Sequence, residues 1–347
     1  MNKFIQIHFL TSYSASNLNR DDLGRPKTVK MGGVERLRIS SQSLKRNWRV
    51  SDTFYEALAG KIGVRTKNLG VETFKLLKEK GVKEANAKKW AEEIASVFGK
   101  KSKKNPLVID QLVHVSPMEH QEVINLTSKI AEENRAPKSE ELTFLRKEDM
   151  AVDIALFGRM LASKTEHSVE AACQVAHAIS VHGVAVEDDF FTAVDDLNDG
   201  SEHSGSSHLG EQNFGAALYY NYICIDKELL VNNLNGDVEL ANRAIQSLIK
   251  AASMISPSGK QNSFASRAYA DYMMIEKGDY QPRSLSVSFL KPVRGEDYAM
   301  LAREYLRKQR NNFNEVYGIG SDEMPFVEMD AIAGEGSLKN LLEFAIN

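Results

Sequence analysis

A helix start stands out in the sequence at Leu37-Arg-Ile-Ser-Ser-Gln-Ser-Leu-Lys-Arg-Asn-Trp-Arg49. Ser40 and Ser41 are both good N-caps, because a serine hydroxyl can accept a hydrogen bond from a backbone N–H group of the first helical turn. The residues that follow predict a helix running to about Leu58. The other expected strands and helices are placed relative to this helix.

The two faces of this helix differ in chemistry. Leu44 and Trp48 are expected to point to the core, whereas Lys45 and Arg49, four residues apart, share the neighbouring face. The helix start also offers backbone N–H groups and the Gln42 amide, which are donors suited to a phosphate group. An ordinary capped helix with a solvated basic face accounts for the same residues, so the residue types leave both interpretations open.

The segments around this helix alternate between expected strands and expected helices. Residues 11–39 are expected to be irregular and basic, and residues 60–145, rich in Lys, Glu and Ala, to be a helical insertion. Without the insertions the order is strand, helix, strand, strand, helix, strand, which is the ferredoxin-like arrangement of an α+β fold and also the topology of the RNA-recognition motif. The expected strands are residues 3–10, 171–182, 215–226, 272–275 and 285–289, and the expected later helices are residues 238–255 and 296–310, the last of the chain.

Charge is distributed unevenly along the chain. The formal net charge is −3, but residues 1–50 contain ten Lys or Arg against three Asp or Glu, a net of +7. The rest of the chain therefore sums to −10, and residues 165–226 hold eleven Asp or Glu and no Lys or Arg. This asymmetry favours a basic surface for a polyanion, although two ordinary solvated faces are the alternative. The basic residues between the first strand and the helix are Arg20, Arg25, Lys27, Lys30, Arg36 and Arg38.

Several classes of protein are disfavoured. The two cysteines form no CxxC pair and the histidines match no zinc spacing, so we expect neither a metal nor a cofactor. No phosphate-binding loop or nucleophile-elbow motif is present. The N-terminus lacks the apolar run of a secretory signal and no window is apolar for long enough to span a bilayer, which predicts a cytoplasmic protein without a membrane partner.

Short motifs follow one another over most of the chain. They are Leu18-Asn-Arg-Asp-Asp22, Gly32-Gly33, Arg38-Ile-Ser-Ser-Gln-Ser-Leu-Lys-Arg46, Val152-Asp-Ile-Ala-Leu156, Gly158-Arg-Met160, Ala176-His-Ala-Ile179, Phe191-Thr-Ala-Val-Asp-Asp-Leu197, Ser207-His-Leu-Gly210 and Gly259-Lys-Gln261. Through these motifs and their order along the chain, the protein resembles the CasC-type backbone subunit of Cascade, the type I-E CRISPR surveillance complex. That subunit belongs to the RAMP superfamily. Residues 60–145 and 288–347 match that pattern poorly, so the resemblance rests on the remaining segments.

The resemblance implies a subunit built like a hand. A palm with a modified RNA-recognition-motif fold is implied for residues 1–59, 146–186 and 214–347, the last of which also carries C-terminal helices. The insertion at residues 60–145 would be helical fingers. The acidic residues 187–213 would be a β-hairpin thumb.

The resemblance also implies how the chain contacts RNA. Side chains of the basic segment and the helix would hold phosphates of a CRISPR RNA guide, and a kinked base would lie beside Met160. Thumb residues would form an apolar wedge that breaks the base stack. The implied phosphate contacts are Arg20, Lys27, Ser40, Gln42, Lys45 and Arg49, and the implied wedge comprises Phe190, Phe191 and Thr192.

The implied partners follow from the same resemblance. Several copies would form a helical filament along one CRISPR RNA, kink it at regular intervals and leave its bases free to pair with a target DNA strand in antiviral defence. The large, small, 5′-handle-binding and hairpin-binding endonuclease subunits of Cascade would join the assembly. Lys100, Lys101, Lys103 and Lys104 are candidates for contacts with DNA, and a solvated helix end is the alternative reading of them. No catalytic residue is implied.

Three other functions stay open on the sequence. A metal-dependent, RNA-cleaving backbone subunit would use thumb carboxylates among Asp195, Asp196 and Asp199. A processing endonuclease would use His203 or His208 for general acid–base chemistry. A protein scaffold without RNA contact is the third, and the charge of +7 in residues 1–50 argues against it.

Overall fold

The computed structural model describes residues 2–146, 151–161, 164–193 and 208–347. The chain forms two compact units, each assembled from separate segments. Unit 1 comprises residues 1–54, 175–224 and 248–347, and unit 2 comprises residues 55–174 and 225–247. The expected helical insertion at residues 60–145 therefore lies within unit 2, and residues 194–207 of the expected thumb lie outside the described residues.

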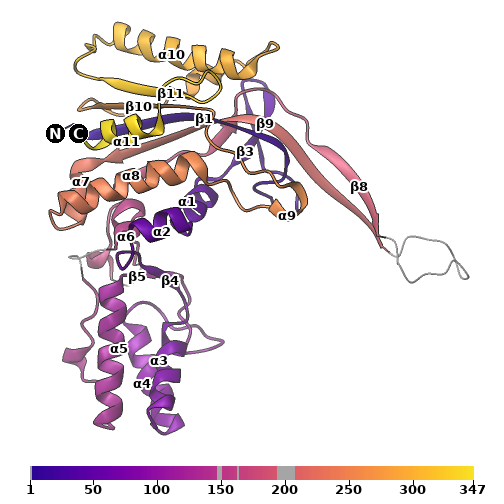
Figure 1. Cartoon of the computed structure of the whole chain (residues 1–347). Coiled ribbons are helices and arrows are strands. Elements are labelled where there is room, and N and C mark those ends of the chain that lie inside the picture. Colours follow the sequence, from indigo (N-terminus) through magenta and orange to yellow (C-terminus); the bar gives the residue numbers. More distant parts are fainter. Residues whose placement is uncertain (1, 147–150, 162–163, 194–207) are drawn as a thin grey trace, which may run out of the picture. The chain divides into compact units, whose positions relative to one another are not determined.

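A nine-stranded sheet in the described chain draws most of its strands from unit 1, and only β6 and the end of β9 include residues of unit 2 (Figure 1). Its strands follow the order β11-β10-β1-β9-β7-β3-β2, and β6 and β8 also pair with β9. The strand bounds are β1 Phe4–Ser16, β2 Thr28–Met31, β3 Val34–Ile39, β6 Cys173–Val175, β7 Ala178–Ser180, β8 Glu187–Ala193, β9 His208–Asp226, β10 Tyr272–Gly278 and β11 Phe326–Asp330.

The central strands confirm the expected α+β fold. In chain order, β1, α1 (Ser41–Arg49), β7, β9, α8 (Val238–Met254) and β10 run strand, helix, strand, strand, helix, strand, and the four strands lie in the order β10-β1-β9-β7. Helix α1 lies along one face of the sheet and α10 (Tyr298–Val316) along the other (Figure 1). Ala302 and Leu306 of α10 pack with sheet residues in one buried cluster. Each sheet face is therefore covered by a helix that buries apolar side chains.

The basic segment is more ordered than the sequence predicted. The expectation that residues 11–39 are irregular is wrong, because β1 continues to Ser16 and β2 and β3 form an antiparallel hairpin. Gly32 and Gly33 make the two-residue turn with φ values of 62° and 82°, a conformation that strongly favours glycine. A Cβ atom on Gly32 would also lie 1.7 Å from the Leu290 carbonyl oxygen. The sequence prediction missed the hairpin because β3 is completed by pairing with the distant strand β7.

Four further boundaries differ from the sequence predictions. The expected strand at residues 171–182 is divided into the two short strands β6 and β7. The expected strand at residues 285–289 is a 3-10 turn, η3 (Ser286–Phe289). The expected helix to Leu58 is divided into α1 and α2 (Asp52–Ala57), because the Ser51 side chain accepts a hydrogen bond from the Phe54 N–H and restarts the helix. Helix α10 is not the last of the chain, since α11 (Leu338–Ile346) follows it.

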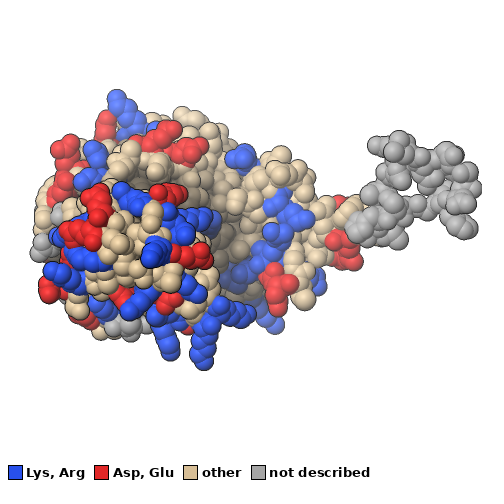
Figure 2. Space-filling view, turned by 90° about the horizontal axis from the view of Figure 1, so that it is seen from below, with Lys and Arg blue, Asp and Glu red and all other residues tan. Residues whose placement is uncertain are grey.

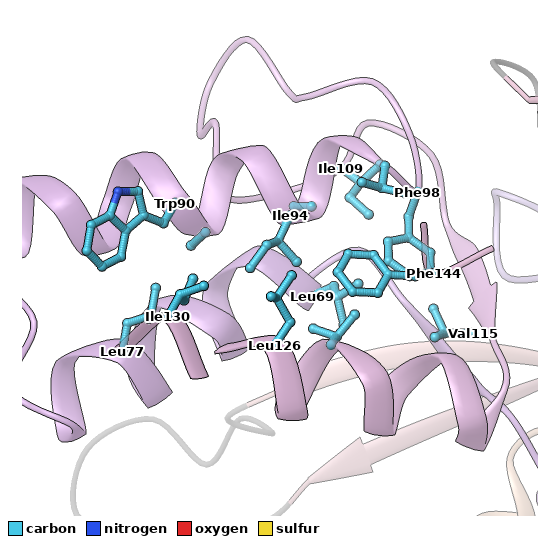
Figure 3. Packing of buried hydrophobic residues seen from close by; sticks show 14 of the residues in the cluster. Leu69, Leu77, Trp90, Ile94, Phe98, Ile109, Val115, Leu126, Ile130 and Phe144 are labelled. Carbon is cyan, nitrogen blue, oxygen red and sulfur yellow. The ribbon is translucent and has the colours of Figure 1, made fainter. Parts of the chain in front are cut away.

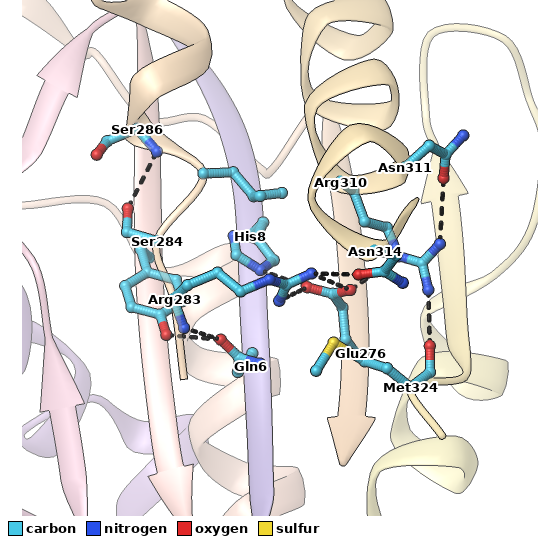
Figure 4. Close-up of polar contacts among 12 residues, drawn as sticks. Gln6, His8, Glu276, Arg283, Ser284, Ser286, Arg310, Asn311, Asn314 and Met324 are labelled. Carbon is cyan, nitrogen blue, oxygen red and sulfur yellow. Dashed lines mark hydrogen bonds and ion pairs between the residues drawn. The ribbon is translucent and has the colours of Figure 1, made fainter. Parts of the chain in front are cut away.

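A buried ionic network ties β1, β10 and α10 together in unit 1 (Figure 4). Glu276 is fully buried and accepts hydrogen bonds from His8 at 3.1 Å, from Arg283 at 2.7 Å and from Arg310 at 2.8 Å. The other ring nitrogen of His8, Nδ1, lies 2.9 Å from the Tyr220 hydroxyl. A buried carboxylate with two guanidinium partners fixes these elements strongly, because removing one partner leaves an uncompensated charge in the core.

Unit 2 contains a mostly helical core (Figure 3). Helices α3, α4 and α5 pack their apolar faces together, with Leu77, Trp90, Ile94 and Ile130 among the buried residues. The bounds are β4 Val64–Thr66, α3 Leu69–Glu79, α4 Glu84–Ser96, β5 Val113–Val115, α5 Pro117–Glu132, η1 Ser139–Glu141, α6 Val152–Phe157, η2 Thr165–His167 and α7 Lys227–Asn233. In the described part of the chain, no helix has the length and apolar character needed to cross a bilayer.

The residue 152–160 motif stabilises unit 2 from within. Asp153 accepts hydrogen bonds from the Gly63 N–H at 2.8 Å and pairs with His114 Nε2 at 2.7 Å. Arg159 is almost fully buried and forms a 2.7 Å ion pair with Glu119, which also completes the N-terminal capping box of α5. These contacts explain the polar residues of the motif by structure alone.

Candidate nucleic-acid interface

The candidate interface begins at the junction between β3 and α1. Ser40 is the N-cap, with its side chain accepting a hydrogen bond from the Ser43 N–H, and its own N–H donates to Asn19 Oδ1 at 2.9 Å. The Gln42 amide is exposed and stays available as a donor at the positive end of the helix dipole, and the mostly buried Ser40 hydroxyl donates no hydrogen bond within the described residues. The junction is thus shaped to receive an anion, provided that a cationic surface surrounds it.

Lysine and arginine side chains surround this helix start. Lys45 and Arg49 are half-buried on one face of α1, while Leu44 and Trp48 are buried as predicted. Lys27 is half-buried, and its carbonyl accepts a 2.8 Å hydrogen bond from the Arg38 N–H, which fixes Lys27 beside β3. Within the described part of the chain, neither Lys27 nor Lys45 is ion-paired with a carboxylate.

Arg20 lies close to this group along the backbone. It is exposed, and its backbone bridges to Pro26 across a turn. The Lys27 N–H donates to the Asn19 carbonyl at 2.8 Å, and Asn19 also holds Ser40 through its side chain. Asn19 therefore links the loop that carries Arg20 and Lys27 to the cap of α1. The structure brings five of the six expected phosphate contacts to this junction, with Arg49 two turns into the helix.

Arg36, named with the basic segment from the sequence, is not part of the surface. Its side chain is fully buried and donates hydrogen bonds to the Ser180 carbonyl at 2.7 Å and the Phe289 carbonyl at 2.8 Å. Burial lowers the pKa of Arg36 from its ordinary value. Arg38 lies two residues further along on the same face of β3 and is half-buried, so strand alternation does not separate the two arginines. Arg36 differs from Arg38 because the Ser180 and Phe289 carbonyls take up its guanidinium inside the core.

His177 extends the candidate interface onto the next strand. Its Nδ1 atom lies 2.9 Å from Nη1 of Arg38, and its ring is exposed. Burial of the ring nitrogens together with the charges of Arg38, Lys27 and Lys45 lowers the pKa of His177. The field of Lys27 and Lys45 thus reaches His177, so residues from the basic loop, β3, α1 and the β6–β7 connection share one small region.

A loop after α8 also packs against the start of the basic segment. Gly259 lies against the Leu18 carbonyl, where a Cβ atom would come within 2.3 Å of the oxygen. Lys260 and Ala265 flank α9 (Gln261–Phe264) in the left-handed region, with φ values of 51° and 48°. Strained backbone at two non-glycine residues is often retained at functional sites. Gly259-Lys-Gln261 was noted as a motif in the sequence, but its position beside Leu18 was not predictable.

The expected wedge residues lie on the described arms of the β8–β9 hairpin. Phe191 pairs with Gly210, and a Cβ atom on Gly210 would lie 2.3 Å from the Phe191 ring, so the glycine makes room for the aromatic side chain. Phe190 is 66% exposed and Phe191 is 41% exposed, and as neighbours in a strand they face opposite sides of the hairpin. Phe190 and Thr192 therefore share one face, and Phe191 occupies the other.

Met160 belongs to unit 2, where its side chain is 84% exposed. It lies at a cavity of about 260 Å³ whose lining also includes Phe98, Lys100, Gln111 and Leu112. Of the basic run considered for DNA contacts, Lys101 pairs with Glu92 at 3.3 Å. Unit 2 thus exposes an apolar residue and a lysine at the same hollow.

Positive charge gathers at one place on the surface. Lys and Arg side chains lie close together where the body meets the hairpin, a few Asp and Glu side chains lie on the hairpin, and both signs are mixed over the rest of this view (Figure 2). The hairpin carboxylates Asp188 and Asp189 accept hydrogen bonds from Asn213 and Gln212 across the two strands. Asp195, Asp196, Asp199 and His203 lie outside the described residues. Among the residues that are described, no group of three or more His, Cys, Asp or Glu is placed to hold a metal ion.

The family is decided by a comparison along almost the whole chain. A family model described as CT1975-like protein matches residues 5–342. The chain belongs to the CT1975-like protein family. No curated protein matches it. The matched range contains the junction of β3 and α1, the hairpin arms and Met160, so all of the candidate contacts lie within the family region.

Two solved structures resemble this CT1975-like protein over nearly its full length. One is a chain of a "CRISPR RNA-guided surveillance complex, pre-nicking", with 30% identity, 99% of each chain covered and a TM-score of 0.83. The other is a chain of a "CRISPR RNA-guided surveillance complex", with 27% identity, 99% of this chain and 98% of that chain covered, and a TM-score of 0.63. The mixed fold of this CT1975-like protein is therefore that of surveillance-complex subunits.

Proposed function

We propose that this CT1975-like protein is a non-enzymatic backbone subunit that binds CRISPR RNA through its phosphates. The observation that carries the proposal is the capped start of α1 with Lys27 and Lys45 beside it, in a chain similar end to end to surveillance-complex subunits. Lysines without carboxylate partners hold a flexible phosphate chain without reading bases. Target specificity then comes from base pairing by the guide, as in other RNA-guided complexes.

The finer features of the proposal follow the CasC-type resemblance. Copies polymerise along the guide in the cytoplasm as a type I-E Cascade filament, and the hairpin wedge of Phe190, Phe191 and Thr192 kinks the strand while Met160 contacts a displaced base. A target DNA strand pairs with the exposed bases, and the other Cascade subunits bind at the ends and along the filament. Apolar side chains between bases are a recurring means of kinking nucleic acid.

The deciding experiment is a native-gel titration of the protein onto a long single-stranded RNA, with and without Mg²⁺, followed by a denaturing gel. Discrete successive shifts with intact RNA support polymerisation without cleavage. RNA shortened only when Mg²⁺ is present would replace the proposal with the RNA-cleaving alternative that uses thumb carboxylates. The absence of any shift would overturn RNA binding itself.

A double variant, Lys45→Ala with Arg49→Ala, tests the assigned surface. RNA affinity should fall evenly across RNA sequences, and the dependence of log affinity on log salt should flatten by about 0.7 for each lost phosphate contact on a single strand. The matched control is Lys308→Ala with Lys339→Ala, which removes the same charge from α10 and α11. A loss that depends on RNA sequence, or an equal loss in the control, would contradict the assignment.

A further inference from the structure

We propose that His177 and Arg38 complete a phosphate site with Lys27 and Lys45, and that RNA binding there is coupled to uptake of a proton by His177. The inference rests on the proposed function, because the phosphate belongs to the bound RNA. It adds two side chains that the sequence comparison did not assign and makes affinity depend on pH.

Pairing of distant strands assembles the site. Strands β3 and β7 are antiparallel, with Arg38 opposite Ile179 and Ile39 opposite Ala178. This register places His177, just before β7, beside the Arg38 side chain, where Nη1 and Nδ1 are 2.9 Å apart. The backbone hydrogen bond between Arg38 and Lys27 adds the loop lysine to the same group.

The contact between Arg38 and His177 defines the state of the free protein. A guanidinium can only donate hydrogen bonds, so Nδ1 of His177 accepts and the ring is neutral, with its proton on Nε2. In that state the exposed ring offers one N–H donor to a ligand. Protonation at Nδ1 would end the bond to Arg38 and free the guanidinium to pair with an incoming phosphate oxygen.

Among the described residues, the charges that act on the pKa of His177 are all positive. They belong to Arg38 on β3, Lys27 in the basic loop and Lys45 on α1, and together with burial they lower the pKa of His177. Within the described residues, no carboxylate forms an ion pair with Lys27, Lys45 or His177. A phosphodiester carries one negative charge and would offset the field of these cations. The pKa of His177 should therefore rise when RNA binds, and binding should draw a proton from solution.

The sign of the pH effect follows from linkage. Because the bound state holds His177 protonated over a range where the free state does not, RNA affinity should increase as pH falls below neutrality. One proton per site limits the change to about tenfold per pH unit. Well above the pKa of His177 in the bound state, affinity should become independent of pH.

The test is the affinity of the full chain for a short oligouridine, measured by fluorescence anisotropy at constant ionic strength between about pH 5.5 and about pH 8. Uracil is chosen because it has no basic ring nitrogen that titrates in this range. The wild type should bind more tightly on acidification, whereas His177→Gln should show a flat profile. His120→Gln is the matched control, since it removes a histidine that pairs with Glu72 in unit 2.

Two further readouts separate a phosphate contact from a structural role. His177→Lys supplies a permanent cation and should bind with little pH dependence and at least as tightly as the wild type at neutral pH. Calorimetry of the wild type in buffers of different ionisation enthalpy should detect proton uptake that His177→Gln lacks. A His177→Gln profile as steep as the wild type would overturn the inference while leaving RNA binding intact. Failure of the wild type to bind oligouridine at any pH would overturn the proposed function as well.

Discussion

Two histidines of unit 1 lie in opposite electrostatic surroundings. His8 is fully buried and its Nε2 lies 3.1 Å from the Glu276 carboxylate, which also binds Arg283 and Arg310. His177 is exposed and is surrounded by Arg38, Lys27 and Lys45 with no carboxylate paired to it in the described chain.

The surroundings of the two histidines distinguish a charge cluster that stabilises the fold, around Glu276, from the cluster around His177 that we propose binds phosphate. Burial and neighbouring cations lower the pKa of both histidines, but a hydrogen bond and the charge of Glu276 oppose that effect at His8, whereas no carboxylate is among the causes at His177. At Glu276, burial opposes ionisation, yet hydrogen bonds from His8 and Arg283 outweigh it and lower the carboxyl pKa. The first cluster has its counterion within the chain, whereas the described residues provide no carboxylate partner for the second.

The largest expected effect comes from Glu276→Gln, which keeps the shape of the side chain but removes its charge. The buried guanidinium of Arg310 and the partly buried one of Arg283 then lack a counterion, and the free energy of unfolding should fall by about 3–5 kcal/mol. Urea unfolding followed by Trp48 fluorescence in a Trp90→Phe background reports on unit 1. In the same background, Glu343→Gln, at an exposed pair with Lys339, should change stability by less than about 0.5 kcal/mol. A loss as small as that of the control would show that the network is not structural.

A smaller effect is expected in the pH dependence of stability. Because the folded-state pKa of His8 lies below the ordinary value of 6.5, the unfolded chain binds a proton that the folded chain excludes. Stability should therefore fall as pH decreases below about 6.5, by at most about 1.4 kcal/mol per pH unit for one proton. Unfolding midpoints at several pH values should show this slope in the wild type and a shallower one in His8→Gln. Equal slopes would assign the proton to another group.

The smallest expected change in stability is at Ser40, which caps α1 and is also expected to contact a phosphate. Ser40→Ala should cost about 1 kcal/mol of stability through loss of the N-cap, whereas Ser40→Gly should cost only a few tenths. Both variants remove the hydroxyl, so both should weaken RNA binding to the same extent. Thermal unfolding and RNA titration on the same samples provide the measurements. If Ser40→Ala instead loses more RNA affinity than Ser40→Gly, in line with its larger loss of stability, Ser40 acts only as the helix N-cap and does not contact phosphate.

Secondary structure with a local cause was predictable from the sequence. The N-cap at Ser40, the two faces of α1 and the long helix α8 depend on residues within a few turns of one another. The β2–β3 hairpin carried a local signal in Gly32-Gly33, but β3 also depends on pairing with the distant strand β7, which the sequence does not show, so the basic segment was predicted to be irregular.

The sequence by itself determined the order of the central elements β1, α1, β7, β9, α8 and β10, the basic character of residues 1–50 and the placement of Lys45 and Arg49 on one face of α1. Only the tertiary structure decided that Arg36 is a core residue and that His177 joins the cations. The physical reason is the sequence separation of the interacting residues. Helix faces and caps depend on residues close in sequence, whereas Arg38 and His177 are 139 positions apart and meet only when β3 pairs with β7.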